Sequence, residues 1–206
     1  LVVYTPAIPA NHLELNFFLN QNFQVMKRAE VLGMITKNTF CFAVAGTHGK
    51  TTTSAILGHI MQPYNATSFL GGISENYHSN LILGADKISV VEADEYDKSF
   101  LNLSPNIACI TSMDADHLDI YGEHAALEES FQEFANKVSD VLIVAKGSKV
   151  SGLSYAINED ADYKISNITV RNGNYIFDVT TPNNHIKEIV FLLPGKHNMM
   201  NALAAL

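Results

Sequence analysis

The sequence predicts an α/β fold in which a doubly wound, mostly parallel sheet carries a phosphate-binding P-loop, with a small antiparallel sheet beside it. From residue 39, apolar strand-like runs alternate with helix-like stretches, which is typical of parallel sheets. The segment GTHGK at residues 46–50 separates one such strand from a helix. After Gly152, short apolar runs are divided by the turn sequences NGN at 172–174 and PNN at 182–184, which favours antiparallel pairing.

The first 36 residues are predicted to be the end of a preceding domain. They hold two strand-like runs, 1–4 and 23–26, and two helix-like stretches, 11–20 and 29–35. This is too little for an independent hydrophobic core. We therefore expect residues 1–36 to be the remnant of an N-terminal domain, and residues 37–206 to form a central domain that is cut short at its C-terminal end.

The central domain is expected to contain regular βα units followed by the antiparallel strands. The predicted parallel strands are 40–45, 89–91, 107–111 and 141–144, and the helices between them are 51–61, 98–102 and 125–138. The antiparallel strands are predicted at 163–165, 168–170, 175–179 and 186–193, and a last helix at 197–206. This pattern gives the chain one large sheet with helices on both faces.

Composition excludes several classes of protein. The chain has 206 residues, 47% of them hydrophobic, which supports a folded core. Its formal net charge of −8 argues against a surface for nucleic acid or anionic membranes. No apolar run approaches ~18 residues, so no membrane span is expected. Cys41 and Cys109 lie in apolar runs and are interpreted as reduced core residues, which suits a cytoplasmic protein.

The segment from Gly46 to Thr52 has the composition of a phosphate cradle. Glycines let backbone N–H groups surround an anion, and the following helix N-terminus adds its positive end. Lys50 can reach phosphate oxygens, and the Thr51 or Thr52 hydroxyl can bind Mg²⁺. Val44 stands where the usual P-loop has its first glycine. The alternative is an ordinary glycine-containing turn between a strand and a helix.

Two further strand ends carry carboxylates, and ligands bind at the carboxyl ends of parallel strands. Residues 92–97 hold Glu92, Asp94, Glu95 and Asp97, which would repel one another without a cation, so Mg²⁺ is the predicted partner. The alternative is a solvated acidic loop.

The second of these strand ends places Asp116 and His117 after a buried strand, where they could bind a divalent ion. Neighbouring Asp114 is a candidate helix cap instead. Near the C-terminus, Asn198 and Asn201 share a helix face and could pair with adenine, although N-cap duty is the alternative for Asn198.

Together these motifs resemble the Mur ligase family of ATP-dependent, amide-forming ligases of peptidoglycan precursor synthesis. The matching segments are GTHGKTTT at 46–53, EADE at 92–95, DHLD at 116–119 and GKHNMMNA at 195–202. His48, the EADE segment and SFLNLSP at 99–105 resemble the branch that joins L-alanine to UDP-N-acetylmuramate. Ser112 departs from relatives that often have Asn there, and we assign it no role.

The resemblance implies a role for each matched residue. Lys50, Glu92 and His117 would be catalytic, and Thr51, Glu92 and His117 would bind Mg²⁺. ATP would be held by Gly46, Thr47, Gly49, Lys50, Thr51, Thr52, Asn198 and Asn201. The muramyl substrate would lie near His48, Gly72, Ser74, Asp94, Glu95 and Asp97. The family's C-terminal domain, which brings the amino acid, is missing from this segment, so the segment alone is not expected to complete the reaction.

Three alternatives stay open. A murein-peptide recycling ligase would join a tripeptide to UDP-N-acetylmuramate, but residues 99–105 suit it less well. A GTPase-type switch usually needs an Asn-Lys-x-Asp segment after a strand, whereas Asn136 and Lys137 end a helix and lack the Asp. A structural or interaction protein with a relic phosphate loop would show no magnesium-dependent ATP binding.

Overall fold

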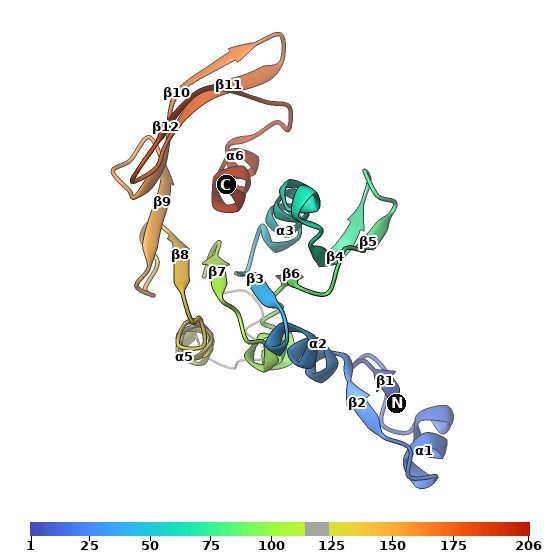
Figure 1. Cartoon of the computed structure of the whole chain (residues 1–206). Helices are drawn as coiled ribbons and strands as arrows, with labels where there is room; N and C mark the ends of the chain where they lie inside the picture. The colour runs from blue at the N-terminus through green and yellow to red at the C-terminus, as the bar shows by residue number, and fades with distance from the viewer. Residues whose placement is uncertain (114–123) are drawn as a thin grey trace.

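The computed structural model describes residues 1–113 and 124–206 and shows a three-layer α/β arrangement (Figure 1). Its strands are β1 (Val2–Tyr4), β2 (Val25–Lys27), β3 (Phe40–Ala45), β4 (Thr67–Ser74), β5 (Ser79–Ile82), β6 (Ile88–Glu92), β7 (Ile107–Ile110), β8 (Val141–Ala145), β9 (Leu153–Ile157), β10 (Tyr163–Arg171), β11 (Asn174–Thr180) and β12 (His185–Phe191). Its helices are α1 (Leu13–Asn20), α2 (Arg28–Lys37), α3 (Lys50–Ile60), α5 (His124–Ala135) and α6 (Lys196–Ala205), with 3₁₀ turns η1 (Gln62–Tyr64) and η2 (Tyr96–Asn102).

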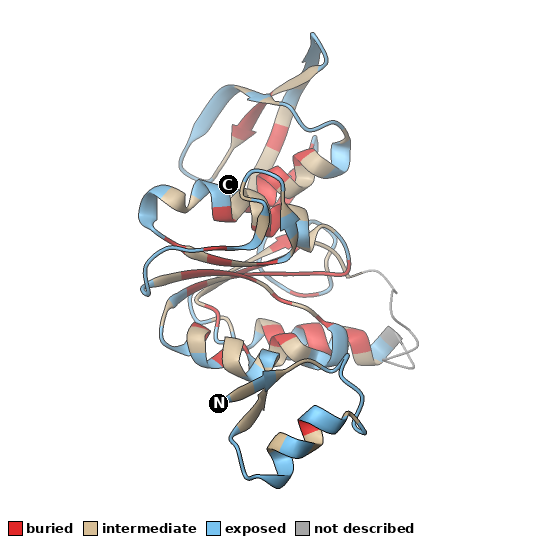
Figure 2. Cartoon of the chain, turned by 90° about the vertical axis from the view of Figure 1, so that its right-hand side faces the viewer, coloured by how far each residue is buried: buried red, intermediate tan, exposed pale blue. Residues whose placement is uncertain are grey.

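One ten-stranded sheet organises the chain, in the order β12-β11-β10-β9-β8-β7-β3-β6-β4-β5. The strands from β10 through β9, β8, β7, β3 and β6 to β4 are joined by parallel pairs. Helices cover both faces, with α3 and α6 on one side and α2, η2 and α5 on the other (Figure 2). The predicted doubly wound α/β class is confirmed.

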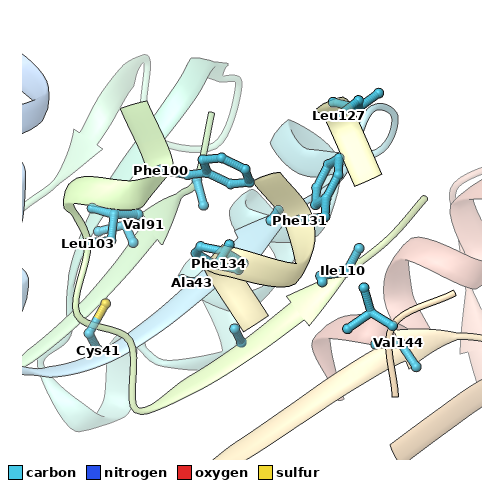
Figure 3. Close-up of a cluster of buried hydrophobic side chains, with 14 residues drawn as sticks. Cys41, Ala43, Val91, Phe100, Leu103, Ile110, Leu127, Phe131, Phe134 and Val144 are labelled. Carbon is cyan, nitrogen blue, oxygen red and sulfur yellow. The ribbon is translucent and has the colours of Figure 1, made fainter. Parts of the chain in front are cut away.

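Two hydrophobic clusters fill the space between the sheet and its helices. The first joins β3, β6, β7 and β8 to η2 and α5, and its centre is aromatic (Figure 3). Phe100 stacks on Phe134 at a ring distance of 5.0 Å and meets Phe131 edge-on at 5.4 Å. Because all three rings are fully buried, η2 is fixed rigidly against α5.

The two cysteines belong to this core, as the sequence predicts. Cys41 packs in the first cluster and Cys109 in the second, on opposite faces of the sheet, and both are free thiols. Burial raises the pKa of Cys41 to about 11 and that of Cys109 to about 12. Both thiols therefore stay protonated and unreactive at neutral pH.

The N-terminal segment forms a small unit of its own. β1 and β2 pair in parallel as a separate two-stranded sheet, with α1 between them in sequence. Helix α2 packs against this unit and against β3, and an ion pair of 3.3 Å joins Lys27 to Asp97 in η2. The domain boundary near residue 37 stays a prediction.

The antiparallel strands extend the main sheet. β10 pairs in parallel with β9, a strand that the sequence pattern does not predict, and β10, β11 and β12 then form an antiparallel ribbon that curves over α6 (Figure 1). Register shifts interrupt β10 after Ser166 and β11 after Phe177, which bends the ribbon away from the parallel strands. The two predicted runs at 163–165 and 168–170 are thus one bulged strand.

The strands β4 and β5, at the opposite edge of the sheet, were also not predicted from the sequence. β4 contains Gly71 and Gly72, and glycine weakens the sequence pattern of a strand.

No helix within the described part of the chain is long and apolar enough to cross a membrane.

Candidate functional site

The loop between β3 and α3 has the shape that a phosphate cradle requires. Gly46 (φ 134°) and Gly49 (φ 80°) both adopt backbone conformations that favour glycine. A Cβ on Gly46 would overlap Thr111 Oγ1, and one on Gly49 would overlap Asn201 Oδ1. Close neighbours therefore require glycine at both positions, and α3 begins directly after the loop, at Lys50.

The end of β7 holds this loop in place. Thr47 N–H donates to the Ser112 carbonyl (3.1 Å), and the Thr47 and Ser112 hydroxyls are 2.9 Å apart. His48 N–H donates to Ser112 Oγ (2.8 Å), and the Thr111 hydroxyl donates to the His48 carbonyl. Ser112, which received no role from the sequence, is thus the anchor of the loop. Its position directly after the strand next to β3 was the available signal.

Lys50 lies in the cradle with its ammonium group fixed by two neighbours. Its Nζ donates to the Gly46 carbonyl (2.7 Å) and to both carboxylate oxygens of Glu95 (2.7 and 3.0 Å). The Glu95 side chain is completely buried, and that of Lys50 is 13% exposed. The acidic run thus supplies a counter-ion to the cradle lysine.

Glu92 ends β6 beside the start of α3. Its Oε1 accepts from the Thr51 hydroxyl (3.0 Å), and its Oε2 accepts from Gly71 N–H (2.8 Å) and the Ser54 hydroxyl (3.3 Å). A Cβ on Gly71 would overlap this carboxylate, so the close approach of β4 needs glycine. Glu92 and Thr51 together present hard oxygen donors of the kind that Mg²⁺ prefers.

The other two acidic side chains of residues 92–97, those of Asp94 and Asp97, have partners outside the cradle. Asp94 Oδ1 accepts from Tyr96 N–H (3.1 Å) in its own turn, and Asp97 pairs with Lys27 of the N-terminal unit. The four carboxylates therefore do not form one cluster, and no group of three or more His, Cys, Asp or Glu that could hold a metal occurs within residues 1–113 and 124–206. Asp114, Asp116, His117 and Asp119 lie outside the described residues.

A cavity of about 410 Å³ reaches Glu92, the side chain that contacts Thr51 of the cradle. Its walls come from α2 on one side and from β4, β6 and η2 on the other, and Gly71, Glu92 and Asp94 line it next to the cradle. Arg28 of α2 supplies a positive charge at the opposite wall. Gly72 and Ser74, which the sequence places near a substrate, are not part of this wall, although Gly72 faces the Thr51 methyl group.

The two asparagines of helix α6 have different neighbours, and only Asn201 lies beside the cradle. The Oδ1 of Asn201 lies against Gly49, where a Cβ would overlap it. Asn198 donates from Nδ2 to the Pro194 carbonyl (2.7 Å), which steadies the first turn of α6. The N-cap itself is Gly195 (φ 101°), so the alternative of N-cap duty for Asn198 is wrong. The helix starts there because glycine adopts that backbone conformation.

Comparison with known proteins agrees with this geometry. Residues 44–206 match the family described as the Mur ligase middle domain. The UDP-N-acetylmuramate–L-alanine ligase of Flavobacterium johnsoniae is 59% identical over the whole chain, which covers 47% of that protein. The chain thus spans about half the length of the curated relatives it matches.

Solved structures show the same fold. The UDP-N-acetylmuramate-alanine ligase of Thermotoga maritima has a TM-score of 0.86 at 26% identity, with 99% of this chain and 49% of that one covered. A UDP-N-acetylmuramate:L-alanyl-gamma-D-glutamyl-meso-diaminopimelate ligase from Neisseria meningitides has a TM-score of 0.82 at 21% identity, covering 98% and 72%. Because the family match covers residues 44–206, which is most of the chain, the chain belongs to the Mur ligase family.

Proposed function

We propose that the protein to which this chain belongs is a cytoplasmic, ATP-dependent ligase that joins L-alanine to UDP-N-acetylmuramate. The observation that carries this proposal is the contact between the cradle and Glu92, directly beside a cavity large enough for part of a sugar substrate. The high identity to L-alanine ligases over the whole chain supports the choice of amino acid.

The cradle suits the phosphates of ATP. The glycine loop leads directly into the N-terminus of α3, where the helix dipole is positive, and Lys50 adds a positive charge there. Thr51 and Glu92 would hold Mg²⁺, which when bound neutralises phosphate charge. Asn201, whose position next to Gly49 supports this role, is proposed to contact the nucleotide, and His117 is proposed as a further metal ligand from the resemblance alone.

The proposed reaction has two steps. The γ-phosphoryl group passes from ATP to a carboxylate oxygen of the muramyl lactyl group, giving an acyl phosphate and ADP. The amine of L-alanine then attacks the acyl carbon, the C–O bond to phosphate breaks, and the amine loses a proton. Because two anions must meet in the first step, charge neutralisation by Lys50 and the loop N–H groups is the main contribution of this chain.

The cavity is proposed to hold the muramyl end of the sugar nucleotide. Its opening beside Glu92 would bring the lactyl carboxylate near the terminal phosphate, and Arg28 and Asp94 are available for polar contacts on the two walls. His48, exposed at the tip of the loop, and Ser74 and Asp97, which lie outside the cavity, remain proposed substrate contacts on the resemblance alone.

The test is phosphate release by the full-length protein. With ATP, Mg²⁺ and UDP-N-acetylmuramate, we expect release with L-alanine that exceeds release with the other amino acids. Release with the tripeptide but not with L-alanine would instead identify a murein-peptide recycling ligase. No nucleotide-dependent release with any acceptor would refute the ligase proposal altogether.

A further inference from the structure

Glu95 is the most deeply buried charged side chain of the site. It has no exposed surface, and both of its carboxylate oxygens lie within 3.0 Å of Lys50 Nζ. A carboxylate without solvent is stable only beside a cation or several donors. Because the buried oxygens already face the lysine, they are not presented to a sugar substrate in the neighbouring cavity, which Glu95 does not line.

The backbone around Glu95 is fixed on both sides. Ala93, before it, is buried and donates its N–H to the Val44 carbonyl of β3 (2.8 Å). Phe100, after it, donates its N–H to the Asp94 carbonyl (2.9 Å) and packs its ring against Phe131 and Phe134 (Figure 3). The carboxylate therefore sits on a rigid support, as a residue that orients another must.

Lys50, by contrast, has a flexible side chain with four rotatable bonds. Its ammonium has three N–H donors, and the Gly46 carbonyl and the Glu95 carboxylate engage it from two sides. A lysine held in this way keeps its positive charge at one place in the cradle. Without Glu95, the same ammonium could move within the cradle.

We propose that Glu95 is a positioning residue that fixes the Lys50 ammonium in the phosphate cradle, and not a ligand of the sugar substrate. The inference deepens the proposed ligase function and rests on it. Its consequence is a specific kinetic pattern: Glu95 acts on phosphoryl transfer through Lys50, so its loss lowers kcat while leaving the binding of the sugar substrate unchanged.

The test is steady-state kinetics of the full-length protein with Glu95→Gln, which keeps the size of the side chain and removes its charge. We expect kcat to fall about tenfold or more, the effect of losing one charge-assisted hydrogen bond. The KM for ATP and the KM for UDP-N-acetylmuramate should each stay within about threefold of wild type. Glu95→Asp, which keeps the charge but is one methylene shorter, should give an intermediate kcat.

The matched control is Glu128→Gln, which makes the same change in the ion pair with Lys149 on the protein surface. It should leave kcat and both KM values unchanged. ADP titration gives the fraction of binding-competent protein, so that kcat is expressed per intact site. This correction removes any effect of misfolding.

Three results with Glu95→Gln would overturn the proposal: wild-type kinetics, a raised KM for the sugar substrate with unchanged kcat, or a normal kcat per intact site in a partly unfolded sample. An equal loss of kcat in the control Glu128→Gln would overturn it as well. Absence of turnover in the wild-type protein would refute the ligase function itself. In that case the positioning role, which acts on phosphoryl transfer, would be refuted with it.

Discussion

The phosphate cradle and the ribbon β10–β12 each contain a glycine with left-handed backbone and a buried carboxylate, but these features have different roles in the two regions. At the cradle, Gly49 (φ 80°) is pressed against Asn201. In the ribbon, Gly173 (φ 81°) has the same conformation, with nothing within 4 Å of the position its Cβ would take. The first glycine serves a close approach and the second only a turn.

The carboxylates differ in the same way. Glu95 binds a lysine that faces the space for a ligand, whereas Asp178 only holds the ribbon together. Asp178 accepts from Asn167 Nδ2 (2.7 Å) and from Glu188 N–H (2.9 Å), two residues with positive φ where the strands bulge. A site is thus distinguished by polar groups fixed around an accessible space, and not by strained backbone or buried charge alone.

The largest effect is expected from Lys50→Ala. Loss of the cradle cation should lower turnover of the full-length protein by about 10³-fold, measured by phosphate release. It should also lower stability by about 3–5 kcal/mol, because it removes one side of the buried ion pair with Glu95. Lys149→Ala, which breaks the surface pair with Glu128, is the control and should change neither quantity measurably. Near-normal turnover in Lys50→Ala would contradict the role of the cradle.

The matched glycines give the next largest effect. Gly49→Ala and Gly173→Ala should each lose about 1–2 kcal/mol of stability from the left-handed backbone alone. Only Gly49→Ala also forces a clash, with Asn201, so only this variant should lose ADP affinity in a calorimetric titration. Equal ADP affinity in the two variants would show that the approach of Asn201 to the loop is unimportant for nucleotide binding.

A smaller effect is expected from Ser112→Ala. It removes the acceptor of His48 N–H and the partner of the Thr47 hydroxyl, so the loop should be less ordered and the KM for ATP should rise several-fold. Thr181→Ala removes a similar hydroxyl, which accepts from Asn184 N–H in the turn after β11, and serves as the control. If both variants raise the KM alike, the anchoring role of Ser112 is refuted.

The smallest effect concerns Asp178 and the loss of folding stability at acid pH. Hydrogen bonds from Asn167 and Glu188 hold the pKa of Asp178 below its usual value. A carboxyl with a lowered pKa in the folded state stabilises the protein above its unfolded pKa, and that contribution is lost as the pH falls through the folded value. Asp178→Asn should therefore reduce stability at pH 7 and flatten its decline below about pH 5, as measured by urea unfolding. An unchanged acid profile would count against this account.

The sequence predicted the parts of the fold that depend on local pattern. β3 is predicted residue for residue because six apolar residues precede a glycine, and helix α3 begins within one residue of its expected start. β4 and β9 were missed because glycines lie within or just before them, so their pairing depends on neighbours far away in sequence. Long-range pairing is invisible to a local pattern.

The site was predicted in its composition but not in its contacts. The roles of Glu92 and Glu95 could not be divided from the sequence, because they are three residues apart in one acidic run. Only the path of the chain after β6 turns Glu92 to Thr51 and Glu95 to Lys50. The anchor Ser112 was likewise unassigned, because its partners Thr47 and His48 are more than 60 residues away.

The most direct test of the account is backbone hydrogen exchange of the full-length protein with and without ADP and Mg²⁺. If the cradle binds phosphate, exchange should slow in residues 46–52 and at Gly71, which contacts Glu92, while the ribbon from β10 to β12 is unchanged. Unaltered exchange in the cradle, or protection of the ribbon instead, would contradict the central claim that the loop between β3 and α3 is the nucleotide site.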